Sequence, residues 1–231
     1  AYDSAFYLDQ IGFTRDVENF LNKAADGTLN QGGSEEPEDP GEPATANDYN
    51  IACDFDDISY TKLTPSVEGF VAEAEGVSPF GKALKWLRGD AQTAPNASNF
   101  EMQFTPTGKT DETALVFWYS GEEAAANSLV SVMLYDANVN RCFKVKASAA
   151  YQTLSEDGAL QNKTAPADAN IQLEAGFRGW VVIPFTSFVI NWGGEETAAI
   201  APGEVCQIRF ENTGAYDSAF YLDQIGFTRD V

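Results

Sequence analysis

Histidine is absent from this 231-residue sequence, and basic residues are scarce: 14 Lys and Arg stand against 35 Asp and Glu. Without histidine the chain lacks the commonest general base, the usual partner of a serine or cysteine nucleophile, and the usual zinc or copper ligand. Pairs of carboxylates hydrolyse glycosides without histidine, but no pair in this sequence stands out from the surface charge. We therefore expect that the protein is not an enzyme.

The formal net charge of −21 bears on the partners of the protein. A surface this acidic repels polyanions and the anionic face of a membrane. We therefore expect neither nucleic-acid binding nor membrane insertion. The same acidity suits a protein that meets divalent cations outside the cell, so we expect an extracellular or cell-surface location.

Cysteine is also scarce. Cys53, Cys142 and Cys206 each lie in an apolar, strand-like run, and none belongs to a CxxC pair. This spacing does not support a metal knuckle or a redox motif. We expect buried free thiols; one disulfide with a third cysteine left over is the alternative for a secreted protein.

One segment of the chain occurs twice. Residues 1–17, AYDSAFYLDQIGFTRDV, recur without change as residues 215–231. Aromatic and branched residues dominate this segment, which predicts a β-strand that closes a module. The first copy is then the closing strand of a preceding identical repeat, and the chain is one period of a tandem array. An artificial duplication made to stabilise the protein is the alternative.

The residues between the two copies divide into a connecting region and a module. Residues 18–27 have helical spacing at Phe20, Leu21 and Ala24 and end at Gly27, which predicts a short helix. Residues 28–47 alternate proline, glycine and acidic residues and have almost no apolar side chains, which is typical of an extended linker. Residues 48–231 then form one globular module.

The module has an all-β pattern. Short runs of Val, Phe, Trp, Tyr and Ile alternate with turn residues every eight to twelve positions. This predicts a jelly-roll β-sandwich of two antiparallel sheets. The expected strands are 49–56, 69–75, 83–88, 99–105, 113–120, 129–136, 141–148, 170–174, 179–185, 204–211 and 219–228.

Several of these strands alternate between apolar and polar residues, so that one face of each belongs to the core. The expected core positions are Phe100, Met102, Phe104, Val130, Val132, Leu134, Phe143, Val145, Ala147, Cys206, Ile208 and Phe210. Residues 114–119 are apolar on both faces. That strand either lies in the middle of a sheet covered on each side or offers aromatic rings to a ligand.

Four segments carry a family resemblance. Residues 51–57 (IACDFDD) and 220–227 (FYLDQIGF) resemble the first and last strands of calcium-containing jelly-roll carbohydrate-binding modules of bacterial glycoside hydrolases and surface proteins. Residues 176–185 (GFRGWVVIPF) and 80–84 (FGKAL) are similar to strands of large repeat proteins of gut and rumen bacteria. The resemblance spans about residues 49–231, and Gln224 departs from it by replacing a second Asp.

The resemblance implies a structural calcium ion. Because the first and last strands of such modules are neighbours, Asp54 and Asp56 are expected to converge with Asp223 and backbone carbonyls. Ca²⁺ takes six to eight oxygen ligands, to which such a set contributes. A solvated acidic strand end is the alternative.

The outward positions of the alternating strands suggest a sugar-binding surface, because sugars stack on aromatic rings and bond to long polar side chains. The candidate residues are Gln103, Trp118, Tyr135, Lys144, Lys146, Gln207 and Arg209, with Trp192 at a loop tip beside Gly193 and Gly194. The three basic residues favour a polymer that contains uronic acids. An ordinary water-exposed sheet face, with cross-strand pairs such as Glu101 with Lys144, is the alternative.

Two functions follow from these patterns. The first is a non-catalytic carbohydrate-binding module, repeated in a secreted or cell-surface bacterial protein, that binds polysaccharide or glycan with the avidity of several linked sites. The second is a structural repeat of an adhesin stalk or extracellular filament, in which the duplicated strand pairs with neighbouring copies of the module.

Overall fold

The computed structural model describes residues 49–66, 71–88, 99–212 and 218–229. These residues form antiparallel strands and two short 3-10 helices, η1 (Phe185–Ser187) and η2 (Pro202–Glu204). In this part of the chain no helix has the length and apolarity needed to cross a membrane. The first copy of the duplicated segment, the helix predicted within 18–27 and the linker 28–47 lie outside the described residues.

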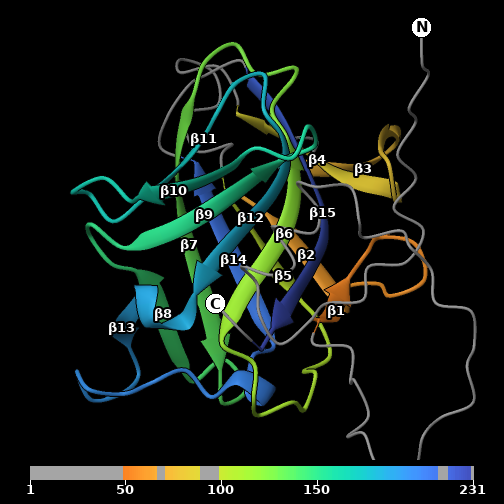
Figure 1. Ribbon diagram of the computed structural model, residues 1–231. Helices are drawn as coiled ribbons and strands as arrows, with labels where there is room; N and C mark the ends of the chain where they lie inside the picture. Colours follow the sequence, from red (N-terminus) through yellow and green to blue (C-terminus); the bar gives the residue numbers. More distant parts are fainter. Residues whose placement is uncertain (1–48, 67–70, 89–98, 213–217, 230–231) are drawn as a thin grey trace, which may run out of the picture.

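Two antiparallel sheets pack face to face (Figure 1). Sheet A has the strand order β10-β9-β12-β6-β15-β4-β3, and β1 pairs with β15 beside this path. Its strands are β1 (Tyr49–Cys53), β3 (Val71–Ser78), β4 (Gly81–Arg88), β6 (Ala114–Ser120), β9 (Ala150–Ser155), β10 (Leu160–Thr164), β12 (Arg178–Pro184) and β15 (Ser218–Thr228).

Sheet B has the strand order β13-β8-β7-β14-β5-β2, and β11 pairs with β7 beside this path. Its strands are β2 (Lys62–Pro65), β5 (Asn99–Gln103), β7 (Ser128–Asp136), β8 (Arg141–Val145), β11 (Ile171–Leu173), β13 (Phe188–Trp192) and β14 (Gln207–Asn212).

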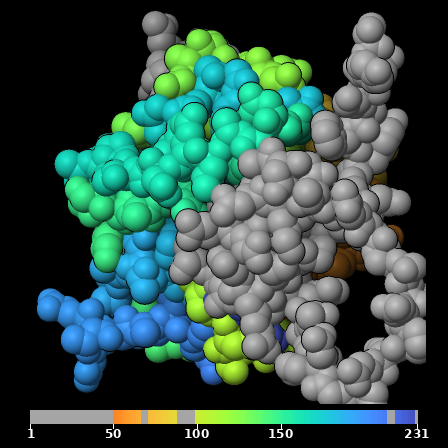
Figure 2. All heavy atoms as spheres, in the orientation of Figure 1, coloured from red at the N-terminus to blue at the C-terminus, as the bar shows by residue number. Residues whose placement is uncertain are grey.

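The eleven expected strands are all present, and the described residues form four further strands, β2, β9, β10 and β13, that were not predicted. The hairpin β9–β10 shows why, because β10 is a largely polar strand at the edge of its sheet. Figure 2 shows this part of the chain, in teal, at the front of the molecule. Such a strand is stabilised by its pairing and leaves no apolar pattern in the sequence.

The core between the sheets is built from the inward positions of the alternating strands. Trp86 of β4 lies at its centre, with ring centroids 5.4 Å from Phe100 and 6.2 Å from Phe220. Phe100 in turn stacks on Phe210 at 5.2 Å. Burial of these large rings supplies much of the driving force for folding.

The predicted core positions are confirmed with two exceptions. Ala147 is exposed, because β8 ends at Val145 and the alternation stops there. Cys206 is only half-buried, since it precedes β14 and the neighbouring Val205 takes the core position. All three cysteines are free thiols, as predicted, although only Cys53 and Cys142 are buried.

The last strand holds sheet A together. Its first half pairs with β4 and its second half with β1, while β6 lies along its other side. A bulge between Asp223 and Gly226 separates the two halves. The prediction that the first and last strands of the module are neighbours is confirmed, since Ile51 pairs with Gly226.

Candidate functional site

Strand register brings the outward residues of sheet B into rows that cross the strands. In the first row, Gln207 of β14 lies between Gln103 of β5 and Tyr135 of β7, and the row continues through Cys142 of β8 to Trp192 of β13. Neighbouring strands are about 4.8 Å apart, so the five strands of this row span roughly 20 Å.

A second row runs beside the first. Arg209 of β14 lies between Glu101 of β5 and Met133 of β7, and the row continues to Lys144 of β8 and Val189 of β13. The two rows together make one surface, which we call the outer face of sheet B.

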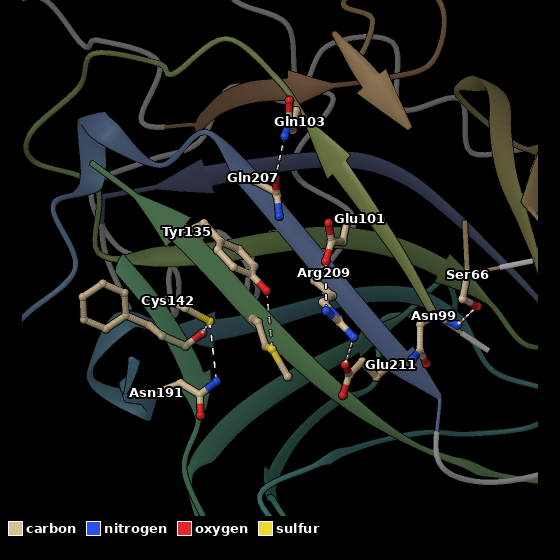
Figure 3. A network of polar contacts seen from close by, with 12 residues as sticks. Ser66, Asn99, Glu101, Gln103, Tyr135, Cys142, Asn191, Gln207, Arg209 and Glu211 are labelled. Atoms are coloured by element: carbon tan, nitrogen blue, oxygen red, sulfur yellow. Dashed lines mark hydrogen bonds and ion pairs between the residues drawn. The ribbon is translucent and has the colours of Figure 1, made fainter. Parts of the chain in front are cut away.

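Arg209 is the centre of a charge network on this face (Figure 3). Its guanidinium donates to Glu101 Oε1 at 2.9 Å and pairs on the other side with Glu211. Burial alone would lower the pKa of Arg209, but the carboxylates of Glu211 and Glu101 outweigh it and the pKa is raised. The arginine is therefore a fixed cation whose charge is already matched by two acids.

The first row begins with a pair of amides. Gln103 Nε2 donates to Gln207 Oε1 at 2.8 Å, and Figure 3 shows this pair beside Tyr135. An amide pair joined by one such bond keeps further donors and acceptors, since each side chain has two N–H groups and a carbonyl oxygen. Gln207 is only 3% exposed, so the partly exposed Gln103 is the member of the pair that can donate to or accept from a ligand hydroxyl.

Tyr135 and Trp192 form the aromatic end of the same row. Their rings meet edge to face with centroids 6.0 Å apart. Tyr135 is 5% exposed, and its burial raises the pKa of the phenol, whereas Trp192 is 46% exposed. Trp192 thus offers a ring to solvent, and Tyr135 supports that ring from the side.

Trp192 lies at the end of β13, not at a loop tip as the sequence suggested. A register shift between Ile190 and Trp192 turns its side chain to the outer face, opposite Cys142. Asn191, at this shift, donates to the Cys142 sulfur at 3.8 Å. The bulge thus fixes the place of the exposed ring.

The two lysines predicted for this surface differ in their surroundings. Lys144 lies in the second row, paired across strands with Met133 and Val189. Lys146 lies just beyond β8, and its Nζ donates to the Thr186 carbonyl oxygen at 2.7 Å. The ammonium group of Lys146 therefore fastens the connection between β12 and β13.

The expectation that Trp118 belongs to the sugar-binding surface is not met. Trp118 lies on the outer side of sheet A and is fully buried, where it packs against Phe80 and lies under the Arg178 guanidinium at 5.5 Å. The strand that carries it, β6, is flanked by β12 and β15. Of the two alternatives for residues 114–119, the covered central strand is correct.

The acidic cluster predicted to bind calcium is assembled around the bulge of β15. Asp223 is fully buried and accepts bonds from the Ser78 hydroxyl and from the Gln224 backbone N–H. Burial, together with the charges of Asp56 and Asp54, raises the pKa of Asp223 to about 7. The three carboxylates are thus close enough to influence one another.

Each of the other two carboxylates also serves the fold. Asp54 Oδ1 accepts from the backbone N–H groups of Asp56 and Ile58, and Asp56 Oδ2 accepts from that of Lys82 at 3.0 Å. Among the described residues, no three His, Cys, Asp or Glu side chains form a group that could hold a metal ion. The calcium ion therefore stays a prediction.

Sequence reasoning missed part of the outer face of sheet B. Glu211 and Met133 occupy outward positions of strands that were predicted, and Val189 lies on a strand that was not. The apolar run of Phe188, Val189 and Ile190 was the signal for β13, which is only five residues long. Adjacency across the sheet follows from strand order, which the sequence did not supply.

Comparison with known proteins gives no sequence-level relative. No model of a known protein family matches the chain, and no curated protein matches it.

Solved structures of carbohydrate-binding modules do resemble the fold. CtCBM11, whose structure was determined in solution, has a TM-score of 0.53 at 10% identity over 82% of this chain and 99% of its own. A family 11 module from Clostridium thermocellum, in complex with a β-1,3-1,4-mixed-linked tetrasaccharide, has a TM-score of 0.48 at 10% identity and covers 79% and 96%. CBM28, a module specific for non-crystalline cellulose, has a TM-score of 0.44 at 11% identity and covers 78% and 93%.

At this level of identity the comparison with CtCBM11 bears on the fold alone. Together with the two antiparallel sheets, it confirms the jelly-roll β-sandwich predicted from the sequence.

Proposed function

We propose that the protein is a non-catalytic carbohydrate-binding module that binds polysaccharide on the outer face of sheet B. One observation carries the proposal: an exposed tryptophan, Trp192, lies in register with the amide pair Gln103 and Gln207. Stacking of a ring on a pyranose face and hydrogen bonding by amides are the two interactions that sugar recognition needs.

The direction of the rows suits an extended polymer. A chain that crosses the strands from β13 to β5 meets Trp192 first, then the edge of Tyr135, and then the amides. The polar groups of β14 and β5 are held in place by bonds to one another, so little side-chain entropy is lost on binding.

Charge favours a neutral glycan over one that contains uronic acids. The sequence suggested uronic acids because Lys144, Lys146 and Arg209 are basic, but Arg209 is neutralised by Glu101 and Glu211. Lys146 is bound to a backbone carbonyl beyond the strand. The net charge of −21 also repels an anionic polymer.

Binding is tested by affinity electrophoresis and calorimetry of the full chain with soluble neutral β-glucans, xylan and polygalacturonate. We expect a neutral polysaccharide to bind, and we expect polygalacturonate not to. The variant Trp192→Ala removes the exposed ring, while Ile58→Ala removes a similarly exposed apolar side chain outside the two rows. Binding that Trp192→Ala leaves intact, or no binding to any of the polymers, would contradict the proposal.

The wider setting is part of the same proposal. Tandem repetition in a secreted or cell-surface protein would give several weak sites the avidity of a linked array.

A structural calcium ion at Asp54, Asp56 and Asp223 is a further part of the proposal. Thermal melts with calcium and with a chelator test the ion, and identical melting temperatures would remove it.

A second candidate function is a structural repeat of an adhesin stalk or filament. The observation that favours it is that the duplicated segment is a central strand of sheet A, so that its twin can pair with a neighbouring module. Light scattering and electron microscopy over a range of concentrations test this function. Growth into filaments would support it, and a monomer at every concentration would contradict it.

A further inference from the structure

The neighbours of β15 in sheet A restrict which strand can occupy its position, which we call the β15 slot. Of its eleven residues all but Gln224 are buried, and three other strands bond to it. Phe220 packs on Trp86 and Phe227 on Phe104, while the Asp223 carboxylate accepts from Ser78. A strand that fills this slot must match it in sequence, in length and in the bulge.

A second segment of the chain meets these demands. Residues 4–14 have the same sequence as β15, so Phe6, Leu8, Asp9 and Phe13 correspond to Phe220, Leu222, Asp223 and Phe227. The Asp-Gln pair at the bulge, where Gln224 has a left-handed φ of 51°, is repeated as Asp9 and Gln10. Nothing in the slot distinguishes the two copies chemically.

The path of the chain permits the first copy to reach the slot of its own module. In sheet A, Thr228 pairs with Tyr49, the first residue of β1. If residues 4–14 took the place of β15, Thr14 would lie beside Tyr49, and residues 15–48 would have to close a loop with adjacent ends. A chain of 34 residues is long enough to span far more than the distance between two paired strands.

We propose that either end of the chain closes the sandwich, so that residues 4–14 and residues 218–228 are interchangeable occupants of the β15 slot of one molecule. The tether gives the first copy an effective concentration on the order of millimolar, which does not change on dilution. The copy that is out of the slot is then free to serve another module, and this makes the exchange a device for linking repeats. The proposal does not depend on glycan binding.

The exchange is tested in the full chain by placing a charge at the same position of each copy. Leu222 is fully buried in the core, and a carboxylate there has no partner, so Leu222→Asp should expel the strand that carries it. We expect Leu222→Asp to keep a cooperative melt and native near-UV circular dichroism, because residues 4–14 take over. Leu8→Asp should melt like the unchanged chain, and the double variant should not fold.

Leu84→Asp is the matched control. Leu84 pairs with Leu222, is equally buried and has no second copy in the chain, so this variant should fail to fold. A single Leu222→Asp variant as unfolded as the double variant would overturn the proposal. Light scattering completes the test: a folded Leu222→Asp monomer supports closure within one chain, whereas folding only as a dimer overturns it.

Discussion

The outer faces of the two sheets both carry aromatic residues, yet the surroundings of these residues are opposite. On sheet A, Trp118 and Trp180 are buried in an apolar cluster with Val116 and Val182. On sheet B, Trp192 is half exposed at the end of a row of amides. The same residue type is thus part of the packing on one sheet and a candidate ligand contact on the other.

The arginines of the two faces do not share this contrast. Arg178 on sheet A is engaged by Glu122, Glu156 and the Val77 carbonyl oxygen, and its guanidinium lies over Trp118. Arg209 on sheet B is likewise held by two carboxylates, and its side chain is about as exposed as that of Arg178, 31% against 29%. The difference between the faces lies in the tryptophans, so mutation of these rings should change stability on sheet A and ligand binding on sheet B.

The largest effect is expected for Trp118→Ala. Removal of a fully buried tryptophan leaves a cavity and costs about 3–5 kcal/mol of unfolding free energy. Urea denaturation measures the loss. A loss below about 1 kcal/mol would mean that the outer face of sheet A is as open as that of sheet B, and the contrast between the faces would be lost.

The next largest effect is a dependence of the unfolding free energy on pH, which comes from two buried carboxyl groups on the side of sheet A. Burial raises the pKa of Asp223 and of Glu112 to about 7 each, so the folded protein holds these protons at a pH where the unfolded chain has released them. Their stabilisation is therefore present in acid and is lost as pH rises towards 7. The slope is at most about 1.4 kcal/mol per pH unit for each group.

The variant Asp223→Asn measures how much of this pH dependence comes from the Asp223 carboxyl group. Between pH 5 and pH 8 the unchanged protein should lose about 3 kcal/mol more unfolding free energy than the variant, because the amide does not ionise. Urea melts at the two pH values measure this difference. Parallel pH profiles for the two proteins would show that Asp223 titrates normally despite its burial.

The next effect, which is smaller in free energy, is a loss of binding affinity in the variant Trp192→Ala. Loss of the stacking ring should weaken binding to a neutral polysaccharide at least tenfold, which is about 1.4 kcal/mol, while stability changes by less than about 1 kcal/mol. Calorimetric titration and a urea melt of the same sample give both numbers. Equal losses of affinity and stability would place Trp192 in the packing, like Trp118.

Trp118 and Trp192 also show how far the sequence alone could lead. Alternation placed Gln103, Tyr135, Lys144 and Arg209 outward, and the structure brings all four to one face. It could not assign Trp118, because residues 114–119 are apolar on both sides and alternation gives no signal there. Whether such a strand is covered depends on contacts distant in sequence, such as that with Phe80.

For Trp192 the sequence suggested the wrong local structure. Glycines follow it and suggested a loop, but pairing of β13 with β8 draws the residue into the sheet. A five-residue edge strand gains its stability from its partner, so its own sequence carries a weak signal. The all-β class and the pairing of the first and last strands followed from longer patterns, which involve many residues and therefore tolerate local exceptions.

The smallest expected effect separates the two lysines of the outer face of sheet B. Lys144→Ala removes a donor from the second row and should weaken binding a few-fold, the cost of about one hydrogen bond. Lys146→Ala should leave affinity unchanged within twofold, because its ammonium group is bound to the Thr186 carbonyl oxygen beyond the strand. Titration of both variants with the same polysaccharide decides the matter. A larger loss of affinity for Lys146→Ala than for Lys144→Ala would show that the ligand binds near the connection between β12 and β13 and not on the two rows.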